Sequence, residues 1–288
     1  MKIAICNGLD YHFECIGFLL EIYNNNNEID IYLKTKNQDK YKWIEYYSSL
    51  FKFDVKYNNF SEDIVNNYDK IFKVTSDDRC INHKSIISIL HLNKMKIGCK
   101  SEKFISFTPY IKGNNIKYIF PIYQPELSNN KISKIVTMLG YYTNRSIDRD
   151  TINFIKNNGN YHFNLIVWGS SSYPNVNNVK NVTVYSKIET KKMIDIVKNS
   201  KYILSKKHIN YDRFSGQLSI AMSYEKPMII DIKTKNAYKL PGIAFKKNYS
   251  EIGKLDDITE DKYQCLKNEI KTLKDKMLNE NKNEPFSK

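Results

Sequence analysis

The sequence predicts an α/β protein built from two domains in tandem, followed by a C-terminal helix. Short runs of β-branched and aromatic residues alternate with longer runs in which apolar residues recur every three or four positions. This alternation is typical of parallel strands connected by helices. It starts again after a polar stretch at residues 124–130 that is rich in Pro, Asn and Ser. We place the domain boundary there, which gives domains at residues 1–126 and 127–260.

The N-terminal half begins with a β-branched strand at residues 2–6, which leads through the Gly-containing turn "NGLDYH" into a helical run. We expect helices at residues 12–23 and 42–51, and a third around the run "SIISILHLNK" at 85–94. Further strands are expected at residues 28–33, 53–57, 69–78, 104–110 and 116–123.

The C-terminal half repeats the order of strand, Gly-containing turn and helix. Strands are expected at residues 134–142, 164–171, 182–186, 202–206 and 227–231, and helices at residues 148–158, 189–200 and 217–224. Two α/β halves that each begin with a strand make two Rossmann-like domains the most economical fold.

The segment 261–288 begins with a charged helix. Its apolar residues form one stripe with spacings of three and four, made of Tyr263, Leu266, Ile270, Leu273 and Met277. The stripe fits a helix laid across the domains, or a short coiled coil that would permit a homodimer. The last residues, 279–288, are expected to be disordered.

The formal net charge of +14 does not by itself indicate a nucleic-acid partner. Lys, Asn, Ile and Tyr are abundant together, which is the bias of an AT-rich genome. The lysines are scattered, with no arginine-rich block and no stacking motif beside them, so we expect a solvated surface. Binding of any duplex through this basic surface remains a third hypothesis that only the net charge supports.

The cysteines favour a reducing compartment. There are five, far apart and with no C-x-x-C pair, so neither a disulfide framework nor a zinc knuckle is indicated. The N-terminus becomes polar too quickly for a signal peptide, and no apolar run approaches the ~20 residues that span a bilayer. We therefore expect a soluble cytoplasmic protein without an integral membrane segment.

Ligands of open parallel sheets bind at the carboxyl ends of the strands, where helix N-termini favour anions. In the N-terminal half this edge would carry Asn7, Gly8, Asp10 and His12, and Thr75, Ser76, Asp77, Asp78 and Arg79. In the C-terminal half it would carry Gly140, Tyr141, Thr143, Arg145, Gly169, Tyr185, Arg213, Ser215, Gly216 and Gln217.

Gly216 stands where a helix N-terminus is predicted, and its lack of a side chain would let the backbone approach a phosphate closely. The alternative is a Gly required by a tight turn. Arg213 could add a bidentate contact to an anion, although a salt bridge is the simpler role. Neither G-x-G-x-x-G nor a Walker lysine motif is present, which argues against NAD or ATP as a ligand.

The runs "KIVTMLGYY", "SKIETKKMIDIVKNSKYIL" and "SGQLSIAMSYEKPMIID" resemble the donor-binding domain of GT-B glycosyltransferases. In that family two Rossmann-like domains face each other across a cleft. The N-terminal "NGLDYHFECIGFLLEIY" is similar to the acceptor-domain opening of glycosyltransferases encoded by large DNA viruses with AT-rich genomes. If the protein is viral, the compartment would be the host cytoplasm.

The resemblance implies transfer of a sugar from a nucleotide diphosphate sugar, UDP- or GDP-linked, to a glycan or other hydroxyl acceptor, without a metal or other cofactor. Backbone groups at Gly140 and Gly216, with Arg145 and Arg213, would stabilise the leaving diphosphate. Tyr185 and the loop around Gly169 would contact the base of the nucleotide.

The acceptor hydroxyl would need a base if the reaction inverts, and the N-terminal candidates are His12, Asp77 and Asp78. Each could instead only cap or flank a helix. His91 falls in a predicted helix and is expected to be a packing residue. His83, His162 and His208 have no carboxylate or Cys partner at ligand spacing, so no metal site is expected.

One departure from the family concerns the helix after Gly216. Many retaining members carry a Glu there, whereas this chain has Ser219 and Ile220. A non-catalytic protein of the same fold that binds a nucleotide sugar or glycan is therefore the alternative function.

Overall fold

The computed structural model describes residues 1–7, 12–34, 41–57, 60–74, 83–91, 103–113, 116–127, 133–140, 147–167, 176, 179–207 and 214–283. The chain divides into two compact units. The first consists of Met1–Tyr123, Asp212–Gly216 and Met277–Lys288, and the second of Gln124–Tyr211 and Gln217–Lys276. The short segment that ends at Gly216 thus belongs to the first unit although it follows most of the second in sequence.

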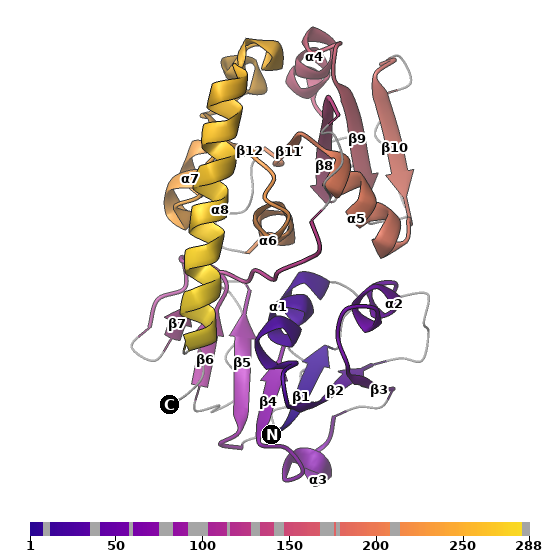
Figure 1. Ribbon diagram of the computed structural model, residues 1–288, viewed down its shortest axis with the longest axis vertical. Coiled ribbons are helices and arrows are strands. Elements are labelled where there is room, and N and C mark those ends of the chain that lie inside the picture. Colours follow the sequence, from indigo (N-terminus) through magenta and orange to yellow (C-terminus); the bar gives the residue numbers. More distant parts are fainter. Residues whose placement is uncertain are drawn as a thin grey trace. The chain divides into compact units, whose positions relative to one another are not determined.

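The first unit contains a parallel sheet in the order β3-β2-β1-β4-β5-β6-β7 (Figure 1). The strands are β1 (Lys2–Asn7), β2 (Glu28–Leu33), β3 (Asp54–Lys56), β4 (Lys70–Lys73), β5 (Ile86–Leu90), β6 (Lys103–Ser106) and β7 (Ile116–Tyr118). Strand order reverses between β1 and β4, so the carboxyl ends of these two strands form the switch point at which open sheets bind ligands.

Among the described residues, the α-helices that follow strands of this sheet are α1 (Phe13–Tyr23), α2 (Trp43–Ser48) and α3 (Glu62–Val65). Most of α1 is buried, including its polar Glu14. Gly17 lets α1 approach α2, because a Cβ at this position would overlap the hydroxyl of Tyr47. That hydroxyl donates to the carbonyl of Phe13 at 3.0 Å, which ties α2 to the first turn of α1.

The prediction of a helix around residues 85–94 was wrong, because the structure has strand β5 at Ile86–Leu90. Ile86, Ile87, Ile89 and Leu90 are all buried in the sheet interior. A strand covered on both faces is continuously apolar, so its pattern cannot be told from that of a buried helix. His91 consequently follows a strand instead of lying in a helix.

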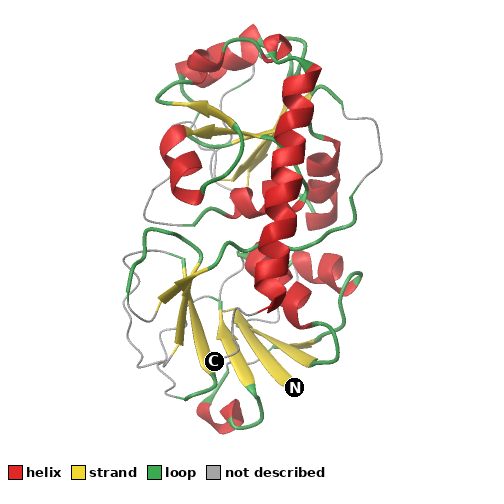
Figure 2. Ribbon diagram, turned by 60° about the vertical axis from the view of Figure 1, so that its left-hand side comes forward, coloured by secondary structure: helices red, strands yellow, loops and turns green. Residues whose placement is uncertain are grey.

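The second unit contains a parallel sheet in the order β10-β9-β8-β11-β12-β13, which repeats the reversal seen in the first. Its strands are β8 (Ile135–Gly140), β9 (His162–Val167), β10 (Val182–Ser186), β11 (Tyr202–Leu204), β12 (Met228–Asp231) and β13 (Ile243–Phe245). The switch point lies between β8 and β11. The strands of each unit lie side by side in one sheet, with helices around it (Figure 2).

The remaining α-helices of the described residues are α4 (Arg149–Asn157), α5 (Thr190–Asn199), α6 (Gly216–Ser223), α7 (Ile232–Tyr238) and α8 (Glu260–Asn283), and two short 3-10 helices lie at Tyr249–Ile252 and Leu255–Asp257. Helix α6 packs through Leu218, Ile220, Ala221 and Met222, all buried as predicted. Helix α7 and β13 were not predicted. Asp231 is the last residue of β12, and its side chain also caps α7. The helix therefore follows the strand without a polar loop that would have marked its start in the sequence.

Helix α8, the yellow helix of Figure 1, confirms the predicted C-terminal helix. Its buried stripe differs from the prediction in its last turns, where Lys274 and Leu278 are buried and the predicted Leu273 and Met277 are half-buried. The Lys274 ammonium donates to the Ser223 carbonyl at 2.9 Å and to Glu225 at 3.0 Å. Residues 279–283, expected to be disordered, are helical, and 284–288 lie outside the described residues.

The fold class is confirmed: two parallel sheets, each with helices, and a C-terminal helix. None of the helices in the described ranges is both long and apolar enough to cross a membrane.

Candidate functional site

A group of polar side chains lies at the switch point of the first sheet, where β1 and β4 end. Asn7 is the buried last residue of β1, and the Val74 amide after β4 donates to the Cys6 carbonyl at 2.9 Å. His12 stands immediately before α1, which places its imidazole at this edge of the sheet.

The central feature is a histidine–carboxylate pair. The Nδ1 atom of His12 lies 3.2 Å from Oε1 of Glu14, and the exposed fractions of the two side chains are 13% and 5%. A buried carboxylate requires a donor, and it accepts here from Nδ1–H. This assignment of the tautomer leaves Nε2 as the basic nitrogen of His12. Glu14 also stands in the first turn of α1, where the helix dipole favours an anion.

His91 packs directly against this pair. Its ring stacks on that of His12, with centroids 4.2 Å apart and planes inclined by 8°. Its Nε2–H donates to the carbonyl of Val74. Nδ1 of His91 lies 4.0 Å from the sulfur of Cys15, which in turn lies 3.8 Å from Oε1 of Glu14.

The Cys15 thiol is not suited to act as a nucleophile. Burial raises its pKa well above the ordinary value, and the neighbouring charge of Glu14 raises it further. The reactive form of cysteine is the thiolate, so the thiol stays protonated and inert at neutral pH.

His12, Cys15 and His91 offer ligand atoms that lie within 4.8 Å of one another. The lone pairs of an imidazole lie in the plane of its ring, and the two ring planes are almost parallel. Lone pairs in parallel planes cannot point at one shared ion, whereas tetrahedral coordination requires that they converge.

Gly216, the first residue of α6, lies against the carboxylate of Glu14. A Cβ at this position would be 2.5 Å from Oε1 and 2.9 Å from Oε2. The backbone at Phe214 holds the segment in place, since its amide donates to the His91 carbonyl at 2.8 Å. The close backbone approach at this glycine is to a protein carboxylate, and its contact with a phosphate stays a prediction.

The switch point of the second sheet is built differently. Gly140 ends β8 with φ 124°, which only glycine adopts readily. After β11, the buried ammonium of Lys207 forms ion pairs with Asp148 and Asp150 and lies 4.7 Å above the ring of Tyr249. Burial pushes the pKa of both carboxyl groups up, but their hydrogen bonds and the charge of Lys207 lower it overall.

Two other predicted donor-site residues are described in the second unit. Tyr185 is half-buried in the edge strand β10, with the ammonium of Lys192 5.6 Å from its ring centroid. Gln217 is buried in α6, and its Oε1 accepts no hydrogen bond from the part of the chain that the structure describes.

The structure brings His12 and Gly216 together through Glu14, and Ser215 precedes Gly216 in the same segment. Outside the described residues lie Gly8, Asp10, Asp77, Asp78, Tyr141, Thr143, Arg145, Gly169 and Arg213. Glu14, Cys15 and His91 were not among the residues predicted for the site. The only local signal was a carboxylate two positions after His12.

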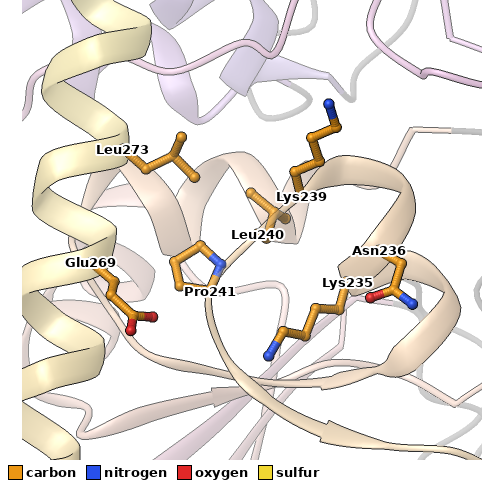
Figure 3. Close-up of a pocket in the computed structure, with 7 residues that line it drawn as sticks. All are labelled: Lys235, Asn236, Lys239, Leu240, Pro241, Glu269 and Leu273. Carbon is orange, nitrogen blue, oxygen red and sulfur yellow. The ribbon is translucent and has the colours of Figure 1, made fainter.

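A groove in the second unit contains none of the predicted site residues. It is formed by the end of α7, the turn after it and one face of α8 (Figure 3). The ammonium of Lys235 is already bonded to the carbonyl of Gly242 at 2.8 Å. Nothing in this groove resembles a reaction centre.

No protein-family profile matches the sequence, and no curated protein matches it either. Solved structures do resemble it. HepE of Anabaena, in complex with UDP, matches with a TM-score of 0.64 and 10% identity over 98% of both chains. AviGT4, a glycosyltransferase of avilamycin A biosynthesis, matches with a TM-score of 0.60 and 9% identity over 96% of this chain and 93% of that one.

UDP-GlcNAc 2-epimerase from Neisseria meningitidis, bound to UDP-GlcNAc, matches with a TM-score of 0.51 and 13% identity over 97% of this chain and 94% of the epimerase. At these identities the likeness concerns the fold. The chain thus has the α/β fold of the GT-B glycosyltransferases and of this epimerase, with two parallel sheets and a C-terminal helix.

Proposed function

We propose that this protein is a glycosyltransferase that moves a sugar from a nucleotide diphosphate sugar to a hydroxyl acceptor, with His12 as the general base. The observation that carries the proposal is the pair formed by His12 Nδ1 and the buried carboxylate of Glu14, 3.2 Å apart at the switch point of the first sheet. A base oriented by a carboxylate is a recurring arrangement for activating a hydroxyl group.

In the proposed reaction, Nε2 of His12 takes the proton of the acceptor hydroxyl while the hydroxyl oxygen attacks the anomeric carbon. The bond from that carbon to the diphosphate breaks, and the diphosphate leaves with the electron pair. Glu14 stabilises the imidazolium that forms. A single displacement inverts the anomeric configuration, which agrees with Ser219 and Ile220 standing where many retaining members have a Glu.

The donor would bind to residues of the predicted C-terminal domain, 127–260. We propose UDP as the nucleotide, because HepE and the epimerase were each solved with UDP or a UDP-sugar. Gly140 and Gly216 would supply backbone donors to the diphosphate, and the other proposed contacts are Gln217, Tyr185, Tyr141, Thr143, Arg145, Gly169, Arg213 and Ser215. Asn7, Gly8 and Asp10 would line the acceptor side. No metal or other cofactor is needed for this chemistry.

A thermal-shift screen with UDP, GDP, CMP, dTDP and their sugars tests the donor site. A ligand that binds only the folded protein raises the melting temperature by mass action. We expect a shift with UDP, and we expect Arg213→Ala to abolish it while Lys191→Ala, an exposed lysine of α5, keeps it. A screen in which no nucleotide changes the melting temperature would refute the donor site.

Turnover of a UDP-sugar distinguishes a transferase from a non-catalytic binding protein and from an epimerase. Release of UDP from a UDP-sugar that His12→Ala reduces by about 10²-fold or more would support the transferase, since general-base catalysis contributes ~10²–10⁴-fold. Binding of UDP without turnover of any sugar would favour the alternative of a non-catalytic binding protein. Conversion of UDP-GlcNAc to its 2-epimer without an acceptor would favour an epimerase.

A further inference from the structure

We infer that His91 is a positioning residue for the His12–Glu14 pair: its ring fixes the plane of the His12 imidazole, and its backbone holds the segment that packs on Glu14. The inference rests on the proposed function, because the orientation of His12 matters for proton transfer. His91 itself need not touch a substrate.

The ring of His91 is held from several sides. Its Nε2–H donates to the carbonyl of Val74, at the end of β4. The ring of Phe107 meets it edge-on at 5.5 Å, with planes inclined by 72°. The flat face of this fixed ring lies against His12 at 4.2 Å. Rotation of the His12 ring out of its plane would bring it against the ring of His91, which these contacts hold.

His12 needs such support because its backbone is in an uncommon conformation. Its φ of 66° lies in the left-handed region, which non-glycine residues adopt only where their surroundings hold them. It precedes α1 without a side-chain cap bond among the described residues. The stacked ring of His91 supplies a contact that stabilises this conformation.

The backbone of His91 acts on the other member of the pair. Its carbonyl accepts from the amide of Phe214 at 2.8 Å, and the Phe214 ring packs on Phe107 and Phe120. Two residues later, Gly216 lies directly against the carboxylate of Glu14. His91 therefore constrains the base through its ring and the carboxylate through its carbonyl.

Three variants test the role of the ring. His91→Leu and His91→Gln remove the flat face, whereas His91→Phe restores it without the Nε2 donor. Since misplacing a reacting group by about 1 Å costs on the order of 10²-fold in rate, we expect kcat to fall about 10- to 100-fold in the Leu and Gln variants. The KM for the nucleotide sugar should stay unchanged, and kcat should recover at least partly in the Phe variant.

A second readout is independent of turnover. Nitrogen-15 spectra of the histidine rings report which nitrogen of His12 carries the proton. We expect the Nδ1–H form in the native protein and in His91→Phe, and a mixture of forms in His91→Leu and His91→Gln. The control is His162→Gln in β9, where Nε2 bonds to Thr183 at 2.8 Å, and it should change neither readout.

A native-like His12 spectrum and native kcat in His91→Leu or His91→Gln would overturn the inference, as would a Phe variant no better than Leu. If one of the two does not fold, the other decides. If the native protein turns over no sugar donor but the spectra change as expected, the positioning role stands and the proposed transferase fails.

Discussion

Gly216 and Glu14 are 202 positions apart in the chain, yet a Cβ on Gly216 would lie 2.5 Å from Oε1 of Glu14. The carboxylate cannot simply move aside, because it is buried and holds Nδ1 of His12. The absence of a side chain at position 216 is therefore a condition for the His12–Glu14 pair.

Gly216→Ala should displace the Glu14 carboxylate and weaken its bond to His12. We expect kcat to fall about 10-fold or more, with an overpacking cost of about 1–3 kcal/mol in unfolding free energy. Steady-state kinetics and urea unfolding measure the two effects. Gly159→Ala is the matched control, since a Cβ there would meet only the Lys156 carbonyl at 3.7 Å, an ordinary contact. Native kcat in Gly216→Ala would contradict the coupling.

Glu14→Gln keeps the size of the side chain but removes the charge that stabilises a protonated His12. We expect kcat to drop about 10- to 100-fold, a fraction of the ~10²–10⁴-fold contributed by the whole base. The dissociation constant for UDP, measured by calorimetry, should change little, because Gln has the size of Glu and leaves the adjoining Gly216 backbone in place. Weaker UDP binding with native kcat would place Glu14 at the donor instead.

Lys207→Met should destabilise the second unit, because it leaves Asp148 and Asp150 without their cation. Breaking a buried pair costs about 3–5 kcal/mol, and we expect about 2 kcal/mol here because the Asp148 side chain is 50% exposed. The folded-state pKa of both carboxyl groups is lowered. Their contribution is therefore present above the unfolded pKa near 4 and is lost as the pH falls through the folded pKa.

Urea unfolding of Lys207→Met and the native protein at about pH 7 and about pH 3 checks this. The difference in unfolding free energy between the two proteins should be smaller at the acidic pH. Lys180→Met, at an exposed turn position, is the control and should cost little at either pH. A difference that stays constant with pH would show that the ion pairs do not cause it.

Lys226 should make stability depend on pH in the alkaline range. Burial, followed by the charge of Lys267, lowers its pKa from 10.5 to about 8, against the opposing charge of Glu225. Between these values the unfolded chain holds a proton that the folded protein has released, so stability rises with pH in this window. The folded protein therefore carries, below pH 8, a penalty of about 3 kcal/mol.

Lys226→Met removes this penalty together with the bond from Nζ to the Lys198 carbonyl at 2.6 Å. The unfolding free energy of the variant, relative to that of the native protein, should be highest near neutral pH and should fall toward about pH 10. Unfolding in urea at three pH values measures the trend. Lys271 is exposed on α8, and the unfolding free energy of Lys271→Met should differ from that of the native protein by the same amount at each pH. A constant difference for Lys226→Met as well would rule out the predicted titration.

The sequence by itself determined the two parallel α/β units, most of their elements and the packing face of α6, because these follow from the local period of apolar residues. It also pointed to His12 and Gly216, since both stand next to a predicted helix N-terminus after a strand. It could not separate the buried strand β5 from a helix, because a strand covered on both faces has no alternating polar side.

Only the tertiary structure decided what these residues contact. Parallel strand order places β4 beside β1 and β5 beside β4, which brings His91 onto His12 and within 4.0 Å of Cys15, 76 positions away. It also seats Gly216 on Glu14. Such contacts depend on which strands are neighbours and on the close approach of distant backbone segments, and neither property leaves a periodic trace in the sequence.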